Sequence, residues 1–176
     1  LVPSVAFEAG TSKVFEGSKT VVVPLVFTKA FEAPVTLTYS LSGTATAGPK
    51  GAGGDFEVSG YDPVSNVGQI SVSPGDTSAA IQVTIYDDGL LSENVETIHF
   101  TLLGGSLQTY FLGALQSHDL YIEDNDGVWT AGFEFADSSG YLAYNIELIQ
   151  EDGQFTGRVL ADDGVVPMPE EDDANR

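Results

Sequence analysis

Apolar and polar residues alternate with a period of two along most of this chain. The runs that show this pattern are PVTLTYSL (34–41), AIQVTIYD (80–87), TIHFTLLG (97–104) and the shorter GQISVS (68–73) and HDLYIED (118–124). Successive side chains of a strand point to opposite faces, so the alternation predicts strands with one buried and one exposed face. The inward positions then include Leu37, Val83 and Phe100.

One further run, KTVVVPLVF (19–27), is apolar at nearly every position. Pro24 lies inside it, and proline cannot donate a hydrogen bond to a central sheet ladder. We therefore expect this strand to lie at a sheet edge or to carry a bulge.

Turn-forming residues separate the strands. They cluster in the segments AGPKGAGGD (47–55), YDPVSNVG (61–68), SPGD (73–76) and LLGG (102–105). No stretch shows the 3.6-residue period of an amphipathic helix. Many short strands joined by Gly- and Pro-rich turns predict an all-β protein with an antiparallel β-sandwich.

The pattern changes after Gly127. Three longer runs of strand character follow, at 128–136, 141–150 and 154–161, and EDG (151–153) between the last two is typical of a hairpin turn. We expect a β-sandwich over residues 1–127 and a small antiparallel β meander, or the start of a following domain, over 128–164. Residues 165–176 are acidic and nearly lack apolar anchors, so we expect a disordered tail.

The charge balance narrows the choice of partners. Six Lys and Arg residues face 26 Asp and Glu residues, for a formal net charge of −20. Such a chain is unsuited to nucleic acid or to anionic membrane surfaces, which attract basic patches. The acidity favours cations as partners, or solubility alone.

Other features bound the protein class. No cysteine is present, which rules out disulfides and cysteine-based zinc or redox sites. No apolar run approaches the length of a membrane span, so we expect no membrane insertion by this segment. The sequence begins LVPSV without Met, and we interpret it as a fragment of a longer protein whose targeting signals lie elsewhere.

Carboxylates recur where the expected strands end. The candidate metal ligands are Glu16, Asp55, Asp87, Asp88, Glu93, Glu96, Asp124 and Asp126. In a sandwich, loops at alternate strand ends meet at one pole, which would gather these side chains. Calcium takes about six to eight oxygen ligands in flexible geometry, whereas magnesium keeps more water and zinc prefers His or Cys. Turn chemistry is the alternative explanation, because Asp bonds its own backbone in turns.

Taken in order, six segments resemble the Calx-beta domain family over roughly residues 4–126. The segments are VFEG (14–17), PVTLTYSLSGTATAG (34–48), GDFEV (54–58), GQISVSPGDTSAAIQVTIYDD (68–88), ENVETIHFTL (93–102) and LYIEDND (120–126). The resemblance implies an immunoglobulin-like sandwich of about seven strands. It also implies Ca²⁺ ligands at one pole, at the eight acidic positions given above.

Three positions depart from the family pattern. PKGAGG (49–54) lengthens the loop before Asp55, and the stretch between Asp88 and Glu93 is one residue longer than usual. Which of Asp87 and Asp88 faces the metal is therefore open. Asn125 occupies the middle of the closing acidic triplet, where one charge is lost.

Nothing in the sequence indicates an enzyme. Neither a G-x-S-x-G nor an H-E-x-x-H motif is present, and we interpret His99 and His118 as surface histidines without a role. The resemblance favours a calcium-binding module that rigidifies or couples neighbouring domains of a secreted or cell-surface protein, with a role in adhesion. The alternatives are a metal-independent adhesion or carbohydrate-binding module, with Trp129 as a stacking residue, and an accessory domain of an extracellular hydrolase.

Overall fold

A computed structural model describes residues 2–87, 94–104, 109–125, 127–137, 140–151, 154–161 and 164–165. The strands are β1 (Ser4–Phe7), β2 (Thr11–Phe15), β3 (Lys19–Phe27), β4 (Val35–Gly43), β5 (Phe56–Val58), β6 (Tyr61–Asp62), β7 (Val67–Val72), β8 (Ser78–Ile85), β9 (Glu96–Leu103), β10 (Phe111–Leu112), β11 (Ser117–Glu123), β12 (Gly127–Asp137), β13 (Gly140–Glu151), β14 (Gln154–Ala161) and β15 (Gly164–Val165). The chain forms two units: the first comprises Leu1–Asp88 and Asn94–Asp124, and the second comprises Gly89–Glu93 and Asn125–Arg176.

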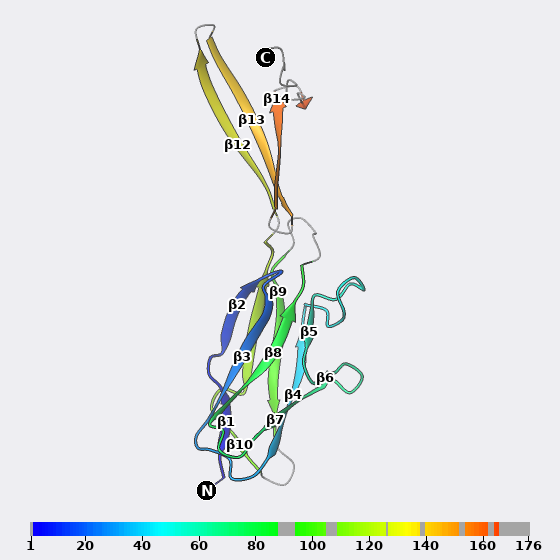
Figure 1. Ribbon diagram of the computed structural model, residues 1–176, viewed down its shortest axis with the longest axis vertical. Helices are drawn as coiled ribbons and strands as arrows, with labels where there is room; N and C mark the ends of the chain where they lie inside the picture. Colours follow the sequence, from blue (N-terminus) through cyan, green and yellow to red (C-terminus); the bar gives the residue numbers. More distant parts are fainter. Residues whose placement is uncertain are drawn as a thin grey trace, which may run out of the picture. The chain divides into compact units, whose positions relative to one another are not determined.

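The first unit is a β-sandwich, as predicted (Figure 1). One sheet has the strand order β10-β1-β3-β8-β5 and the other has the order β2-β11-β9-β4-β7-β6. The pairs are antiparallel except β1–β10 and β2–β11, which are parallel. Because β1 and β2 belong to different sheets, the chain crosses between the sheets at residues 8–10.

The core of the sandwich follows from the alternation. Leu37, Tyr39 and Leu41 of β4 are buried, and so are Ile98 and Phe100 of β9. The intervening polar residues are exposed or half-buried, because each strand has one wet face. Burial of the apolar face contributes roughly 25 cal/mol for each Å² removed from water.

The expected edge position of the Pro24 strand is wrong, because β3 lies between β1 and β8. However, β1 pairs only with the C-terminal end of β3, where Phe7 lies opposite Leu25. The Pro24 carbonyl accepts a hydrogen bond from the Glu8 amide at 3.1 Å. In an extended strand the nitrogen points to the same side as that carbonyl, so the missing donor faces the end of β1 and leaves the β3–β8 ladder intact.

A buried tyrosine occupies the centre of the six-stranded sheet. Tyr39 is fully buried and lies opposite Gly68 in the β4–β7 register. Its ring packs against that of Phe100, with centroids 6.1 Å apart. Within the described part of the chain its hydroxyl has no hydrogen-bond partner. The pKa of Tyr39 is raised to about 12, mainly because the side chain is buried and to a lesser extent because Tyr61 lies nearby.

Replacing Tyr39 by phenylalanine is expected to stabilise the protein by about 1 kcal/mol at neutral pH, since a buried polar group without a partner costs about that much or more. In the parent, the folded pKa lies above the unfolded value of about 10. The free energy of unfolding of the parent is therefore unaffected by this hydroxyl's ionisation below about pH 10. It falls as the pH rises from about 10 through about 12, because the unfolded state loses this proton more readily than the folded state. Urea unfolding of both proteins across that range checks this. A Phe variant that is no more stable at pH 7 and loses as much stability on alkalinisation would contradict it.

The second unit is a four-stranded antiparallel sheet in the order β12-β13-β14-β15 (Figure 1). Three of its strands match the predicted meander closely, and the β13–β14 hairpin closes at the Glu151–Gln154 pair, as the EDG turn predicts. The additional strand β15 pairs Val165 with Leu160, so the first residue of the predicted disordered tail lies in a strand. Residues 166–176 lie outside the described residues.

Candidate metal centre

Five of the eight predicted metal ligands belong to the described part of the sandwich. They are Glu16, Asp55, Asp87, Glu96 and Asp124. The other three, Asp88, Glu93 and Asp126, lie outside the described residues. The question for the structure is whether the five lie at the same end of the sandwich.

Strand pairing brings all five to one pole. In the six-stranded sheet Glu123 lies opposite Phe15, and Ile122 lies opposite Glu96. These pairs place Glu16, Asp124 and Glu96 at neighbouring strand ends. In the five-stranded sheet Ile85 lies opposite both Lys19 and Phe56, which places Asp87 near Asp55.

Backbone hydrogen bonds join these strand ends to one another. The Glu16 amide donates to the Glu123 carbonyl at 3.0 Å, and the Gly17 amide donates to the Tyr86 carbonyl at 3.3 Å. The Tyr86 amide donates to the Asp55 carbonyl at 2.8 Å. The second of these bonds links the two sheets, so both contribute to the same pole.

Two of the carboxylates are buried. Glu16 is 8% exposed and Asp87 is 7% exposed. Gly17 follows Glu16 with a φ of +65°, and a Cβ at that position would lie 3.1 Å from Asp87 Oδ2. The glycine of the VFEG segment is thus required by its backbone conformation and by the approach of the Asp87 carboxylate.

The three remaining carboxylates are half-buried. The backbone amide of Thr46 donates to Asp55 Oδ2 at 2.5 Å, and the Asp55 amide donates to the Thr46 carbonyl at 2.9 Å. One Asp55 oxygen is thus engaged by its own loop, which is the turn chemistry considered above. The long loop before Asp55 is held at its base by this pair.

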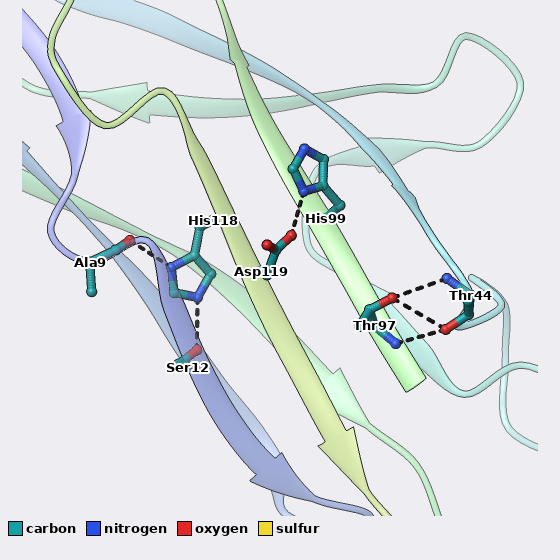
Figure 2. Close-up of polar contacts among 7 residues, drawn as sticks. All are labelled: Ala9, Ser12, Thr44, Thr97, His99, His118 and Asp119. Atoms are coloured by element: carbon teal, nitrogen blue, oxygen red, sulfur yellow. Dashed lines mark hydrogen bonds and ion pairs between the residues drawn. The ribbon is translucent and has the colours of Figure 1, made fainter. Parts of the chain in front are cut away.

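Glu96 begins a strand whose first residues are anchored. The Thr97 amide donates to the Thr44 hydroxyl at 2.9 Å, and the two hydroxyls lie 3.2 Å apart (Figure 2). The Thr44 amide donates to the Thr97 carbonyl at 3.0 Å. These bonds fix the backbone next to Glu96. Less conformational entropy would therefore be lost if Glu96 bound an ion.

The donor set fits calcium better than other metals. It consists of carboxylates, two of them buried, with neither cysteine nor histidine at the strand ends of this pole. In the described residues no three His, Asp or Glu side chains lie close enough to hold an ion. The described residues thus supply two buried carboxylates and three half-buried ones at one pole, and two further predicted ligands, Asp88 and Glu93, belong to the segment between Asp87 and Glu96 that lies outside the described residues.

Two lysines lie at this end of the sandwich: Lys19 begins β3 opposite Ile85, and Lys13 belongs to β2. Lys13 Nζ lies 2.5 Å from Glu123 Oε1, and both side chains are solvent-accessible. The hydrogen bond to the Glu123 carboxylate raises the pKa of the Lys13 ammonium. An exposed pair of this kind contributes little to stability.

The interpretation of His118 as a surface histidine is wrong. His118 is 1% exposed, and its ring packs against the rings of Phe7 and Phe100. Its Nδ1 lies 2.8 Å from the Ala9 carbonyl and its Nε2 lies 2.7 Å from Ser12 Oγ (Figure 2). The sequence carried a signal for this, because residue 118 is in phase with the buried Leu120 and Ile122.

The two histidines have structural positions. His118 holds Ala9, in the crossover between β1 and β2, and so fixes where the chain changes sheets (Figure 2). Although Ser12 and His118 are paired as in a hydrolase, neither residue lines either of two clefts found in the described part of the chain. His99 faces outward, as expected, and its Nδ1 pairs with the carboxylate of Asp119.

Replacing His118 by leucine is expected to destabilise the protein by about 2 kcal/mol, because a buried ring loses two hydrogen bonds and the Ala9 carbonyl and the Ser12 hydroxyl lose their partner in a partly buried place. Urea unfolding monitored by circular dichroism measures this. The matched variant His99→Leu removes only a half-exposed ion pair and is expected to cost less than about 1 kcal/mol. Equal losses in the two variants would show that His118 does not fasten the crossover.

Solved structures share this fold at low sequence identity. The crystal structure of the apo form of a Calx CBD1 domain aligns with a TM-score of 0.54 and 22% identity, covering 72% of this chain and 100% of that chain. That of the calcium binding domain CBD12 of CALX1.1 aligns with a TM-score of 0.55 and 16% identity, covering 89% and 74%. That of CBD12 from CALX1.2 aligns with a TM-score of 0.56 and 17% identity, covering 90% and 82%. The chain therefore has a Calx-beta-like fold.

No protein-family model matches the chain, and no curated protein sequence matches it either. In the described residues, no helix has the length and apolar character needed to cross a membrane.

Proposed function

We propose that this protein is a non-catalytic, calcium-binding β-sandwich module. The ion binds at the pole where β2, β8, β9 and β11 end or begin. Glu16 and Asp87 form the inner part of its coordination shell, and Asp55, Asp88, Glu93, Glu96, Asp124 and Asp126 supply the remaining carboxylates. The observation that carries the proposal is the burial of two carboxylates at the end of the sandwich to which strand register brings five acidic residues.

Electrostatics support this assignment. Like charges at one pole repel one another, and burial raises the cost of each charge because it removes water. In a chain with a formal net charge of −20 a divalent cation offsets both costs. Calcium also accepts carboxylates in mono- or bidentate form and at variable angles, which suits ligands that come from several strand ends.

Binding would stiffen the sandwich at this end. The ligands belong to both sheets, and the segment between Asp87 and Glu96 leads from one sheet to the other. An ion held by both sides of that segment fixes its torsions. The stiffened module then holds the neighbouring domains of the same polypeptide in a more rigid arrangement.

The likeness to the CBD12 structures supports a role between domains. It covers 90% of this chain, about 158 of 176 residues, and so extends past the sandwich, which ends at Asp124. We place the module in a larger secreted or cell-surface protein, where calcium is abundant and adhesion is the function served. Its partners are calcium ions and adjacent domains, with another surface protein or a glycan as the external ligand.

Calcium is expected to raise the midpoint of thermal unfolding by several degrees. An ion that binds only the folded state stabilises it by about 2.7 kcal/mol at a hundredfold excess over the dissociation constant. Melting after chelator treatment, with and without millimolar calcium, measures the shift. A midpoint that calcium leaves unchanged, while the apo protein is folded, would overturn the proposed function.

A further inference from the structure

A cleft lies at one edge of the sandwich, on the outer face of the five-stranded sheet. It has a volume of about 440 Å³, within the range of small-molecule sites. The chain passes here from β5, an edge strand of one sheet, to β6, an edge strand of the other. The polar side chains that line the cleft are Thr20, Glu57, Ser59, Tyr61, Gln82 and Thr84.

Strand register builds the floor of this cleft. Thr84 lies opposite Thr20 on one side and Glu57 on the other, so three polar side chains form a row across β3, β8 and β5. Gln82 precedes Thr84 by two residues and therefore lies on the same face of β8. The Ser59 amide donates to the Gln82 carbonyl at 3.2 Å, which extends the floor past the end of β5.

One wall is the lengthened loop before Asp55. Ala47, Gly48 and Pro49 line the cleft. The Gly48 amide donates to the Phe56 carbonyl at 2.9 Å, and the Ala52 amide donates to the Pro49 carbonyl at 3.1 Å. These bonds hold the loop against β5, so the wall exists before any ligand binds.

A second wall is formed by Tyr61 and Pro63, where β6 leads into its turn to β7. Asp62 accepts hydrogen bonds from the Ser65 hydroxyl at 2.6 Å and from the amides of Val64 and Ser65 at 3.1 and 3.3 Å. The first of these bonds contributes most to lowering the pKa of the Asp62 carboxyl. Tyr61, which lines the cleft, donates from its hydroxyl to Asn66 Oδ1 at 3.0 Å. This wall is therefore fixed as well, which reduces the entropy lost on binding.

The chemistry of the lining indicates the ligand class. Four hydroxyls and one amide each donate and accept hydrogen bonds. Glu57 accepts them, and one of its oxygens already accepts from the Tyr86 hydroxyl. No Lys, Arg or His belongs to the residues that line the cleft. Such a lining does not suit phosphate, sulfate or uronate groups. A polyhydroxylated, uncharged ligand presents both hydrogen-bond donors and acceptors. Its C–H faces can contact the apolar surface of Tyr61, Pro49 and Pro63.

We propose that this cleft binds a neutral saccharide. The site is separate from the calcium ligands, since none of the eight acidic residues lines the cleft. It identifies the external ligand that the proposed function leaves open, rests on that part of the proposed function, and does not require calcium. Glu57, Gln82 and Thr84 hydrogen-bond the sugar hydroxyls, and Tyr61 contacts the ring.

The test uses the full chain labelled with ¹⁵N and the neutral trisaccharides maltotriose, cellotriose, laminaritriose, mannotriose and triacetylchitotriose, each at millimolar concentration in the presence of a calcium chelator. At least one is expected to shift the amide signals of Thr20, Glu57, Gln82 and Thr84 in a saturable way. Replacing Thr84 by valine, a residue that suits a strand, is expected to weaken binding about tenfold, the loss that one hydrogen bond of about 1.4 kcal/mol predicts.

A matched pair of glutamine variants controls for general surface effects. Gln82→Ala is expected to weaken binding about as much as the valine variant, whereas Gln69→Ala, on the exposed face of β7, leaves it unchanged. If none of the five saccharides shifts the cleft signals, the proposal is overturned. It is also overturned if 1,5-diaminopentane shifts them and the saccharides do not, because Glu57 then serves a cationic ligand. Since the chelator is present throughout, failure here leaves the calcium proposal standing.

Discussion

Replacing Asp87 by asparagine is expected to weaken calcium binding about thirtyfold or more while the apo protein stays folded. The Asp87 carboxylate is 7% exposed and lies against Gly17, so its charge acts on the ion with little screening by water. Truncating one member of a buried charge pair costs about 2–5 kcal/mol, and the lower figure corresponds to about thirtyfold in the dissociation constant. Competition against a fluorescent calcium chelator measures the affinity of the parent and the variant.

Asp76→Asn provides the matched control. It makes the same chemical change and the same change in net charge, but Asp76 is an exposed turn residue that accepts a hydrogen bond from the Ser73 amide at 2.9 Å. Asparagine retains an oxygen for that bond, so calcium affinity is expected to match that of the parent. Equal affinities in all three proteins would mean that Asp87 is not a ligand. Equal losses in both variants would mean that only overall charge matters.

The second large effect concerns the core. Replacing Gly68 by alanine is expected to destabilise the protein by about 3 kcal/mol, the upper part of the usual range for overpacking. A Cβ on Gly68 would lie 2.0 Å from Cζ and 2.3 Å from Cε2 of Tyr39. The Tyr39 ring is fully buried beside Phe100 and has no open space into which to turn. Urea unfolding of the variant measures the loss.

Gly10→Ala is the control, because a Cβ at that position meets no atom within 4 Å. Its stability is expected to stay within about 0.5 kcal/mol of the parent. A double-mutant cycle with Tyr39→Leu isolates the contact, since removing the ring removes the clash. Gly68→Ala that costs as much in the leucine background as in the parent would show that the Tyr39 ring is not the cause.

The sandwich could be predicted because each long strand keeps one wet face. Leu37, Val83 and Phe100 are buried as the alternation predicts. The strands β5, β6 and β10 are only two or three residues long, too short for a period to be read. The prediction for Pro24 was wrong because a proline is tolerated wherever no neighbouring strand needs its missing N–H. In β3 that N–H would face the end of β1, where the β1–β3 pairing stops.

The candidate site was less accessible to sequence reasoning. The residue types pointed to calcium, but burial of Glu16 and Asp87 depends on how the two sheets close at the pole. The row of Thr20, Glu57 and Thr84 is set by cross-strand register between segments far apart in the chain. Such register depends on turn geometry and on packing of the whole core, so no local motif reveals it.

Isothermal titration of calcium into the chelator-stripped protein tests the central claim most directly. A carboxylate site at the pole predicts saturable heat with calcium and much weaker binding of magnesium, which holds its water and demands stricter geometry. The heat signal should disappear or weaken strongly in Asp87→Asn. A folded protein that gives no saturable heat with calcium, or the same heat with both ions and in the variant, would contradict the assignment of this pole as a calcium site.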